Sequence, residues 1–258
     1  MLVFVIPLRN PETAQDWERC NALCQQTVRS ALGQSDRDVR VIVSCKDFTP
    51  DILDDRLTIL RYPFETPERT WEANASDKYL KIGHGLVEAH RYAPCYVMKL
   101  DADDLVTKRL SAMVHGIGYK PGYYLDSGYL WSEGSWVVRQ VDRNFHLNCG
   151  SSNIIWCESG DLPSSINENL GAYRIMQHGH NIAVQEYEKL GTPLMPISTP
   201  GGIYRFGHGE NFTAHLKQSG TVHNRPNWKF YVGQLLKLAE LRPLTPSIRQ
   251  DFFGQVNS

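Results

Sequence analysis

The first hundred residues alternate between short apolar runs and longer segments whose apolar residues recur at helical spacing. Residues 2–6 form a continuous β-branched and aromatic run ended by Pro7, which is typical of a strand buried on both faces. We expect strands and helices in the order strand, helix, strand, strand, helix, strand. This order predicts an α/β fold with a Rossmann-like, open and mainly parallel sheet flanked by helices. The expected segments are strands 2–6, 39–43, 57–60 and 96–100 and helices 17–32 and 77–90.

Polar segments follow three of the expected strands, at residues 7–10, 44–47 and 101–104. Ligands of open α/β sheets bind outside the carboxyl ends of the strands. We therefore expect these three segments to meet at one edge of the sheet and to form the binding site.

Composition excludes several classes of protein. The 258 residues carry 27 Lys and Arg against 28 Asp and Glu, a net charge of −1, so the broad basic surface of a nucleic-acid-binding protein is missing. No apolar run approaches the ~20 residues of a membrane-spanning helix. Six cysteines are too few for a disulfide scaffold and are expected as buried thiols. These features predict a cytoplasmic protein with no nucleic-acid partner and no transmembrane segment.

The acidic cluster at residues 101–104 is the most informative motif. Asp101 and Asp103 project to one side of an extended backbone, so both can reach one divalent cation. The alternative is a solvated acidic turn in front of a helix at 107–115, where the helix dipole favours negative charge. A phosphorylated-aspartate hydrolase fits poorly, because its acidic motif lies on the first strand.

After residue 104 the alternation of apolar runs and helical segments is less regular. Residues 131–136 predict a hairpin turn, residues 152–156 a strand, residues 166–178 a helix and residues 228–241 a closing helix. The closing helix carries aromatic residues among basic ones and would either pack on the core, which we favour, or rest on a membrane surface. Three tryptophans offer faces on which sugar rings could stack, although core packing is expected for at least two of them. They are Trp131, Trp136 and Trp156.

The runs at 77–86 (DKYLKIGHGL) and 98–104 (MKLDADD), with the opening VIPLRN at 5–10, resemble glycosyltransferase family 2 and its relatives with the glycosyltransferase A fold and a DXD motif. The resemblance implies one domain over residues 1–258, with a nucleotide-sugar-binding half at 1–105 and an acceptor-binding half at 106–258. It also implies metal-dependent transfer of a sugar, with inversion, from a nucleotide diphosphate sugar, UDP-linked by preference. The acceptor would be a hydroxyl of a glycan or glycolipid, in the cytoplasm or at the inner face of the membrane.

The resemblance assigns roles to individual residues. Asp101 and Asp103 would hold Mn²⁺ or Mg²⁺ with His208, which we prefer to His215 and His223. The nucleotide sugar would be bound by Pro7, Arg9, Asp47, Lys78, Lys81, Asp101 and Ala102. The loop over the donor sugar and acceptor would contain Cys149, Gly150 and Ser151.

Two positions depart from the family pattern. Glu168 takes the place of the catalytic base, but Asn167 stands where a first acid is usual, and the acidic pair that normally ends the second strand is reduced to Asp47. The alternative is that Glu168 has no catalytic role and is a first-turn helix residue stabilised by the helix dipole. His178 and His180 are expected at the C-terminus of the 166–178 helix.

Two other functions remain open. A non-catalytic nucleotide- or carbohydrate-binding relative would account for Asn167 and for the altered 44–47 segment. A sugar nucleotidyltransferase is a second rival, but such enzymes open with a Gly-rich phosphate loop, and residues 7–10 contain no glycine.

Overall fold

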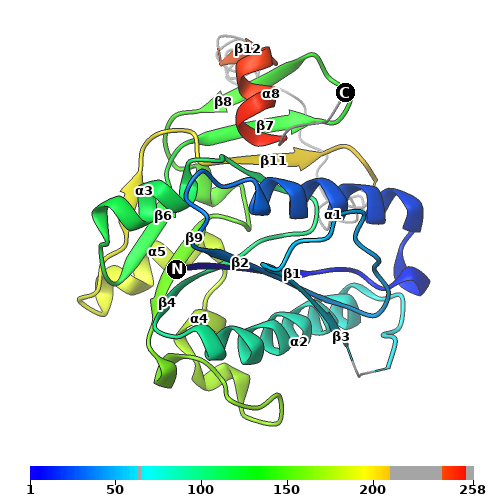
Figure 1. Ribbon diagram of the computed structural model, residues 1–258, viewed down its shortest axis with the longest axis vertical. Coiled ribbons are helices and arrows are strands. Elements are labelled where there is room, and N and C mark those ends of the chain that lie inside the picture. The colour runs from blue at the N-terminus through cyan, green and yellow to red at the C-terminus, as the bar shows by residue number, and fades with distance from the viewer. Residues whose placement is uncertain (63–64, 210–239, 254–258) are drawn as a thin grey trace, which may run out of the picture.

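The computed structural model describes residues 1–62, 65–209 and 240–253, and its strands form two sheets (Figure 1). The larger sheet has seven strands, and β1 lies inside it between β4 and β2. In spatial order they are β10 (Met195–Ile197), β6 (Gly122–Leu125), β9 (Asn153–Cys157), β4 (Cys95–Lys99), β1 (Leu2–Pro7), β2 (Val39–Cys45) and β3 (Leu57–Arg61).

Strand direction in the larger sheet is mostly parallel. β1 pairs in parallel with β2 and β4, β2 with β3, and β6 with β10, whereas β9 runs antiparallel to both of its neighbours. The four strands expected from the first hundred residues are all present. The expected fold class, an open and mainly parallel sheet flanked by helices, is therefore confirmed.

Helices cover both faces of this sheet. Figure 1 shows α1 (Trp17–Leu32) and α2 (Trp71–Ala89) on opposite sides of β1 and β2. Phe4 and Ile6 of β1 pack in the cluster that contains the apolar face of α1, and Val3 and Val5 pack in the cluster that contains α2. Successive side chains of a strand point to opposite faces, so burial of every residue of β1 requires a helix on each side.

The smaller sheet lies beyond α1 and has five strands, in the order β12, β8, β7, β11, β5 (Figure 1). Its core contains Trp131, Val138, Ile203 and Phe252. The predicted hairpin at 131–136 is confirmed, because β7 and β8 pair as antiparallel neighbours. The strands are β5 (Leu105–Val106), β7 (Gly128–Ser132), β8 (Val137–Val141), β11 (Gly202–Phe206) and β12 (Leu241–Pro243), and the helix packed beside them is α8 (Pro246–Phe252).

The first helix has the predicted bounds, but later helices differ from their predictions. The second begins six residues earlier than residue 77, because the Thr70 hydroxyl caps it by accepting a hydrogen bond from the Ala73 amide. The third, expected from Thr107, begins at Leu110, after a turn in which the Leu110 amide donates to the Thr107 carbonyl. The remaining helices and 3₁₀ turns are α3 (Leu110–Ile117), α4 (Arg174–Gln177), α5 (His180–Lys189), η1 (Pro11–Thr13), η2 (His90–Tyr92), η3 (Phe145–Leu147), η4 (Ser159–Asp161) and η5 (Leu170–Ala172).

The continuous helix predicted for residues 166–178 is wrong. The segment forms η5 and the four-residue α4, since the Asn169 side chain accepts a bond from the Gly171 amide and starts a short turn instead of a helix. Leu170 is buried against Gly83 of α2, so tertiary packing fixes the chain here.

All six cysteines are buried and unpaired. Within the described ranges, none of the helices has both the length and the apolar character needed to cross a bilayer. Most of the predicted closing helix, residues 228–239, lies outside the described residues, and Leu241 belongs to β12.

Candidate active site

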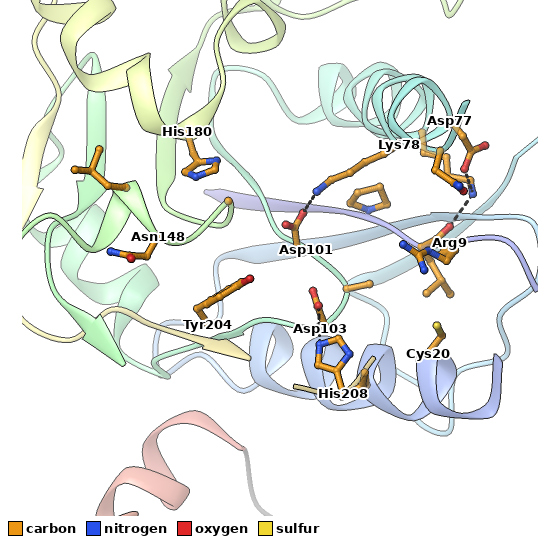
Figure 2. Close-up of a pocket in the computed structure, with 18 residues that line it drawn as sticks. Arg9, Cys20, Asp77, Lys78, Asp101, Asp103, Asn148, His180, Tyr204 and His208 are labelled. Carbon is orange, nitrogen blue, oxygen red and sulfur yellow. Dashed lines mark hydrogen bonds and ion pairs between the residues drawn. The ribbon is translucent and has the colours of Figure 1, made fainter. Parts of the chain in front are cut away.

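An open cavity of about 370 Å³ lies where the chain leaves β1, β4 and β11 (Figure 2). Two of the three predicted strand-end segments, 7–10 and 101–104, contribute to it, as does the region after β11. The third segment, 44–47, does not line it. The lining residues are Pro7, Leu8, Arg9, Cys20, Leu23, Asn74, Asp77, Lys78, Lys81, Asp101, Ala102, Asp103, Leu147, Asn148, Gly150, His180, Tyr204 and His208.

Three carboxylates of the acidic cluster meet beside this cavity. Asp101, Asp103 and Asp104 each have a potential ligand atom within 4.8 Å of the others. Asp101 and Asp103 line the cavity, whereas Asp104 is 1% exposed and lies beneath them. Burial raises the pKa of Asp104, and the charges of Asp103 and Asp101 raise it further.

Asp104 holds the loop that carries the other two aspartates. Its Oδ2 accepts hydrogen bonds from the Ser151 hydroxyl at 2.7 Å and the Cys149 thiol at 3.4 Å, and its Oδ1 accepts one from the Arg205 amide at 3.3 Å. Cys149 and Ser151 are both buried. These two residues of the predicted sugar loop therefore support the acidic cluster from below.

Asp101 has a side chain that is 27% exposed, lines the cavity and is paired with a lysine from α2. Its Oδ1 lies 2.6 Å from Lys78 Nζ, and its backbone amide donates to the Ser151 hydroxyl at 2.8 Å. A Cβ placed on Gly150 would lie 2.8 Å from Asp101 Oδ2, so only glycine leaves this oxygen accessible. Gly150 is thus the member of the loop that shapes the cavity itself.

Asp103 faces the cavity from the other side of Ala102. His208 Nε2 lies 3.0 Å from its Oδ2. Burial opposes ionisation of Asp103, but the hydrogen bond with His208 and the charges of His208, Arg205 and Lys78 together lower its pKa. The sequence prediction that His208 accompanies the acidic cluster therefore agrees with its position, while His215 and His223 lie outside the described residues.

The donor set of this cluster fits a hard divalent cation. Asp101 and Asp103 present carboxylate oxygens, which Mg²⁺ and Mn²⁺ prefer, and His208 adds an imidazole of the kind that Mn²⁺ also accepts. Asp104 already accepts three hydrogen bonds, so it would support such an ion from behind. Asp101, Asp103 and Asp104 form the cluster whose oxygens could hold such an ion, and His208 lies beside Asp103.

Lys81 belongs to a buried polar cluster at the other end of the cavity. Its ammonium donates to the Leu8 carbonyl at 2.8 Å, to Asn10 Oδ1 at 2.7 Å and to Asp77 Oδ2 at 2.7 Å. An ammonium has three protons to donate, and these three bonds within the cavity wall use all of them. Lys81 therefore ties α2 to the end of β1. Lys78 is paired with Asp101, and its side chain is 45% exposed, so it is the lysine that can reach a phosphate in the cavity.

Other predicted residues divide between the cavity and the surface. Pro7, Arg9 and Ala102 line the cavity. Asp47 does not: its exposed carboxylate lies 3.6 Å from Arg61 at the end of β3. The three tryptophans considered for sugar stacking also lie outside it, and Trp156 packs against Tyr96 in the core.

Glu168 lies in the turn before η5 and does not line the cavity. Its Oε1 accepts bonds from the Ser164 amide at 3.0 Å, the Ser164 hydroxyl at 2.7 Å and the Ser165 amide at 2.8 Å, and its Oε2 accepts the Tyr173 hydroxyl. The bonds from Ser164 and Tyr173 lower the pKa of Glu168 to about 2. A carboxylate held in this way is a weak base at neutral pH.

His180 is the main cavity residue that the sequence analysis placed elsewhere. Expected near a helix C-terminus, it is instead the first residue of α5, and its side chain lines the cavity. The preceding Gly179 has an extended backbone and is the N-cap of this helix. This glycine is the only local feature that indicates a helix beginning at residue 180. It does not indicate which part of the sheet the helix faces. Tyr204 and Asp77 were likewise assigned no role from sequence.

No protein-family model and no curated protein sequence matches the chain. Among solved structures, the chain is similar to the crystal structure of S. aureus TarS, with 12% sequence identity and a TM-score of 0.41. The match covers 91% of this chain and 42% of that one, so the chain spans less than half the length of TarS. A likeness at this level carries no argument about function, which has to come from the cavity itself.

Proposed function

We propose that this chain is a metal-dependent glycosyltransferase that moves a sugar from a nucleotide diphosphate sugar to an acceptor hydroxyl. The observation that carries the proposal is the pair Asp101 and Asp103, which open onto one cavity together with Lys78. Metal-binding carboxylates beside a partly exposed lysine suit a diphosphate, because both kinds of positive charge would meet its oxygens. UDP is the expected nucleotide, by the resemblance of the motifs to glycosyltransferase family 2.

Mn²⁺ or Mg²⁺ held by Asp101, Asp103 and His208 would supply positive charge to the leaving diphosphate. The chain's own residues do the rest of the binding. Lys78 can turn from Asp101 to a phosphate oxygen because its side chain is 45% exposed. The buried cluster around Lys81 keeps the end of β1 and the wall of the cavity in a fixed position, against which the nucleoside would rest.

The acceptor is proposed as a glycan or glycolipid hydroxyl, and the reaction as a single displacement that inverts the anomeric carbon. A nucleotide-sugar donor implies action in the cytoplasm, and a lipid-linked acceptor would bring the chain to the inner face of the membrane. Residues 1–105 supply the acidic cluster and most of the donor side, which supports the division into a donor half and an acceptor half.

Calorimetric titration of UDP and GDP tests the donor site. We expect UDP to bind in the presence of MnCl₂ and not in EDTA, and Asp103→Asn to weaken binding by at least about tenfold, since it removes a charged metal ligand. Asp55→Asn, at an exposed position away from the cavity, is the matched control and should bind as the wild type does. Binding of neither nucleotide, with or without Mn²⁺, would remove the basis for the proposal.

A non-catalytic nucleotide-binding protein is the second candidate, and the position of Glu168 favours it. The residue expected to act as base is held outside the cavity by its bonds to Ser164, Ser165 and Tyr173. Slow release of UDP from UDP-glucose or UDP-N-acetylglucosamine in water, assayed with Mn²⁺, separates the two functions. Nucleotide binding without release would favour the binding protein.

A further inference from the structure

His180 occupies the cavity wall on the opposite side of Asp101 from Lys78. Figure 2 shows the Asp101 carboxylate between these two side chains. Lys78 contacts Asp101 Oδ1, whereas a Cβ on Gly150 would lie 2.8 Å from Asp101 Oδ2 and 3.9 Å from His180 Nδ1. The missing side chain at Gly150 therefore leaves open space between the acidic cluster and the imidazole.

The imidazole of His180 is available to a ligand. Across the described ranges, neither of its ring nitrogens has a hydrogen-bond partner, and it forms no ion pair with Asp101. Four titratable groups act on it electrostatically. Burial lowers the pKa of His180, the positive charges of Lys78 and Lys99 and the nearby His146 lower it further, and Asp101 acts in the opposite direction. A lowered pKa favours the neutral imidazole, which is the form that accepts a proton.

The two sides of the cavity also differ in character. Arg9, Asp77 and Cys20 lie on one side of the acidic cluster, and Asn148 and Tyr204 lie on the same side as His180 (Figure 2). An amide and an aromatic ring next to an unpartnered imidazole suit a hydroxylated ring, because the amide can bond its hydroxyls and the aromatic face can cover its C–H surface. This is the side from which an acceptor would approach.

We infer that His180 is the catalytic base that takes the proton of the acceptor hydroxyl, an inference that rests on the proposed function. The acceptor oxygen forms a bond to the anomeric carbon, and the bond from that carbon to the β-phosphate oxygen breaks. The bonding electron pair leaves with the diphosphate, and the hydroxyl proton moves to a ring nitrogen of His180. With water as acceptor, the same step yields the free sugar and the nucleoside diphosphate.

Donor cleavage by His180→Ala tests this role. The probes are UDP-glucose and UDP-N-acetylglucosamine with MnCl₂ and water as the acceptor, and the readout is released UDP. We expect the rate to fall by about 10² to 10⁴, the usual contribution of a general base, with UDP affinity unchanged by calorimetry. His178→Ala, two residues away and outside the cavity, is the matched control and should keep the wild-type rate.

Two further readouts separate a base from a residue that only shapes the cavity. The wild-type rate should fall as the pH drops below the titration of His180, because a protonated imidazole accepts no proton, and His180→Ala should lose this dependence. Added imidazole should restore part of the activity of His180→Ala and none of that of Asp103→Asn.

Failure of the His180 inference can be told apart from failure of the proposed function. A His180→Ala protein that cleaves the donor at the wild-type rate, or that keeps the wild-type dependence on pH, overturns the inference and leaves the proposed function intact. A wild-type protein that binds UDP with Mn²⁺ but cleaves neither donor overturns the inference and favours the non-catalytic protein. Failure to bind UDP or GDP at all overturns both.

Discussion

Aspartate side chains of this chain differ in pKa because their immediate neighbours differ. Asp104 is buried next to two other carboxylates, and its pKa is raised. Asp54 is 18% exposed and accepts two side-chain bonds from Arg56, at 2.9 Å from Nε and 2.7 Å from Nη2, which lower its pKa to about 2. The same functional group thus has a raised pKa in one place and a lowered pKa in another.

The Asp54 pair predicts a dependence of stability on pH. Because the pKa of Asp54 falls from 3.8 to about 2 on folding, its contribution is present above pH 4 and is lost as the pH falls through 2. We expect Asp54→Asn to lower the free energy of unfolding by about 2 kcal/mol at pH 7, and by progressively less below pH 4. Urea denaturation at several pH values measures this difference.

Asp51→Asn is the matched control for Asp54→Asn. Asp51 pairs with Arg29 on the surface, where both side chains are about 40% exposed, so its loss should cost less than about 1 kcal/mol. A destabilisation by Asp54→Asn that stayed constant from pH 7 to pH 2 would contradict the assigned pKa.

Two glycine residues of helix α2 allow it to pack closely against its neighbours. A Cβ on Gly85 would lie 2.4 Å from Val5 Cγ1, and one on Gly83 would lie 2.3 Å from Leu170 Cδ1. Val5 is fully buried in the central strand and has no room to move. Helix α2 can therefore lie against β1 only because Gly85 has no side chain, and against Leu170 of η5 only because Gly83 has none.

Substitution of Gly85 by alanine tests this packing. Alanine favours a helix over glycine by up to about 1 kcal/mol, but at residue 85 we expect a net loss of about 1 to 3 kcal/mol, because the added methyl group overpacks against Val5. Gly116→Ala in α3 is the control, since nothing lies within 4 Å of its Cβ, and it should stabilise the protein. The Tm of thermal unfolding, measured for Gly85→Ala and Gly116→Ala, distinguishes the two effects. An equal gain in Tm at both positions would show that α2 does not need the glycine.

Arg205 connects parts of the whole molecule that are far apart in sequence. It lies on β11 of the smaller sheet, is fully buried, and donates to Gln26 Oε1 at 2.6 Å, to the Leu23 carbonyl at 3.0 Å and to Thr27 Oγ1 at 3.1 Å in α1. Its Nε donates to the Asp103 carbonyl. One side chain thus joins the smaller sheet, the first helix and the acidic cluster.

Arg205→Met should weaken both the fold and the site. We expect a loss of about 3 kcal/mol in the free energy of unfolding, because the carbonyl and hydroxyl groups of α1 and the negative charge of Asp103 lose a buried partner. UDP affinity in MnCl₂ should fall in the same variant, since Asp103 is held by this contact. Arg143→Met, at an exposed position, is the control for both measurements. A folded Arg205→Met protein with unchanged affinity would show that the acidic cluster is positioned without Arg205.

Local pattern was sufficient for much of this protein. Continuous apolar runs predicted β1, β2 and β4, helical spacing closed by Gly33 predicted the bounds of α1, and Asp101 was correctly placed after a strand. These features depend on interactions between residues close in sequence, such as side-chain periodicity, backbone preference and capping. The same pattern brought Pro7, Arg9 and Asp103 to one cavity, because the carboxyl ends of parallel strands share an edge.

Tertiary structure decided the rest. The pairing partner and the direction of β9 and the existence of the smaller sheet depend on contacts between distant residues. The break in the 166–178 segment depends on them in part, because Leu170 packs against α2. Packing of Leu170 against Gly83 is of this kind, and so is the position of His180 opposite Lys78. No local pattern encodes them, because their free energy comes from surfaces that meet only after the chain has folded.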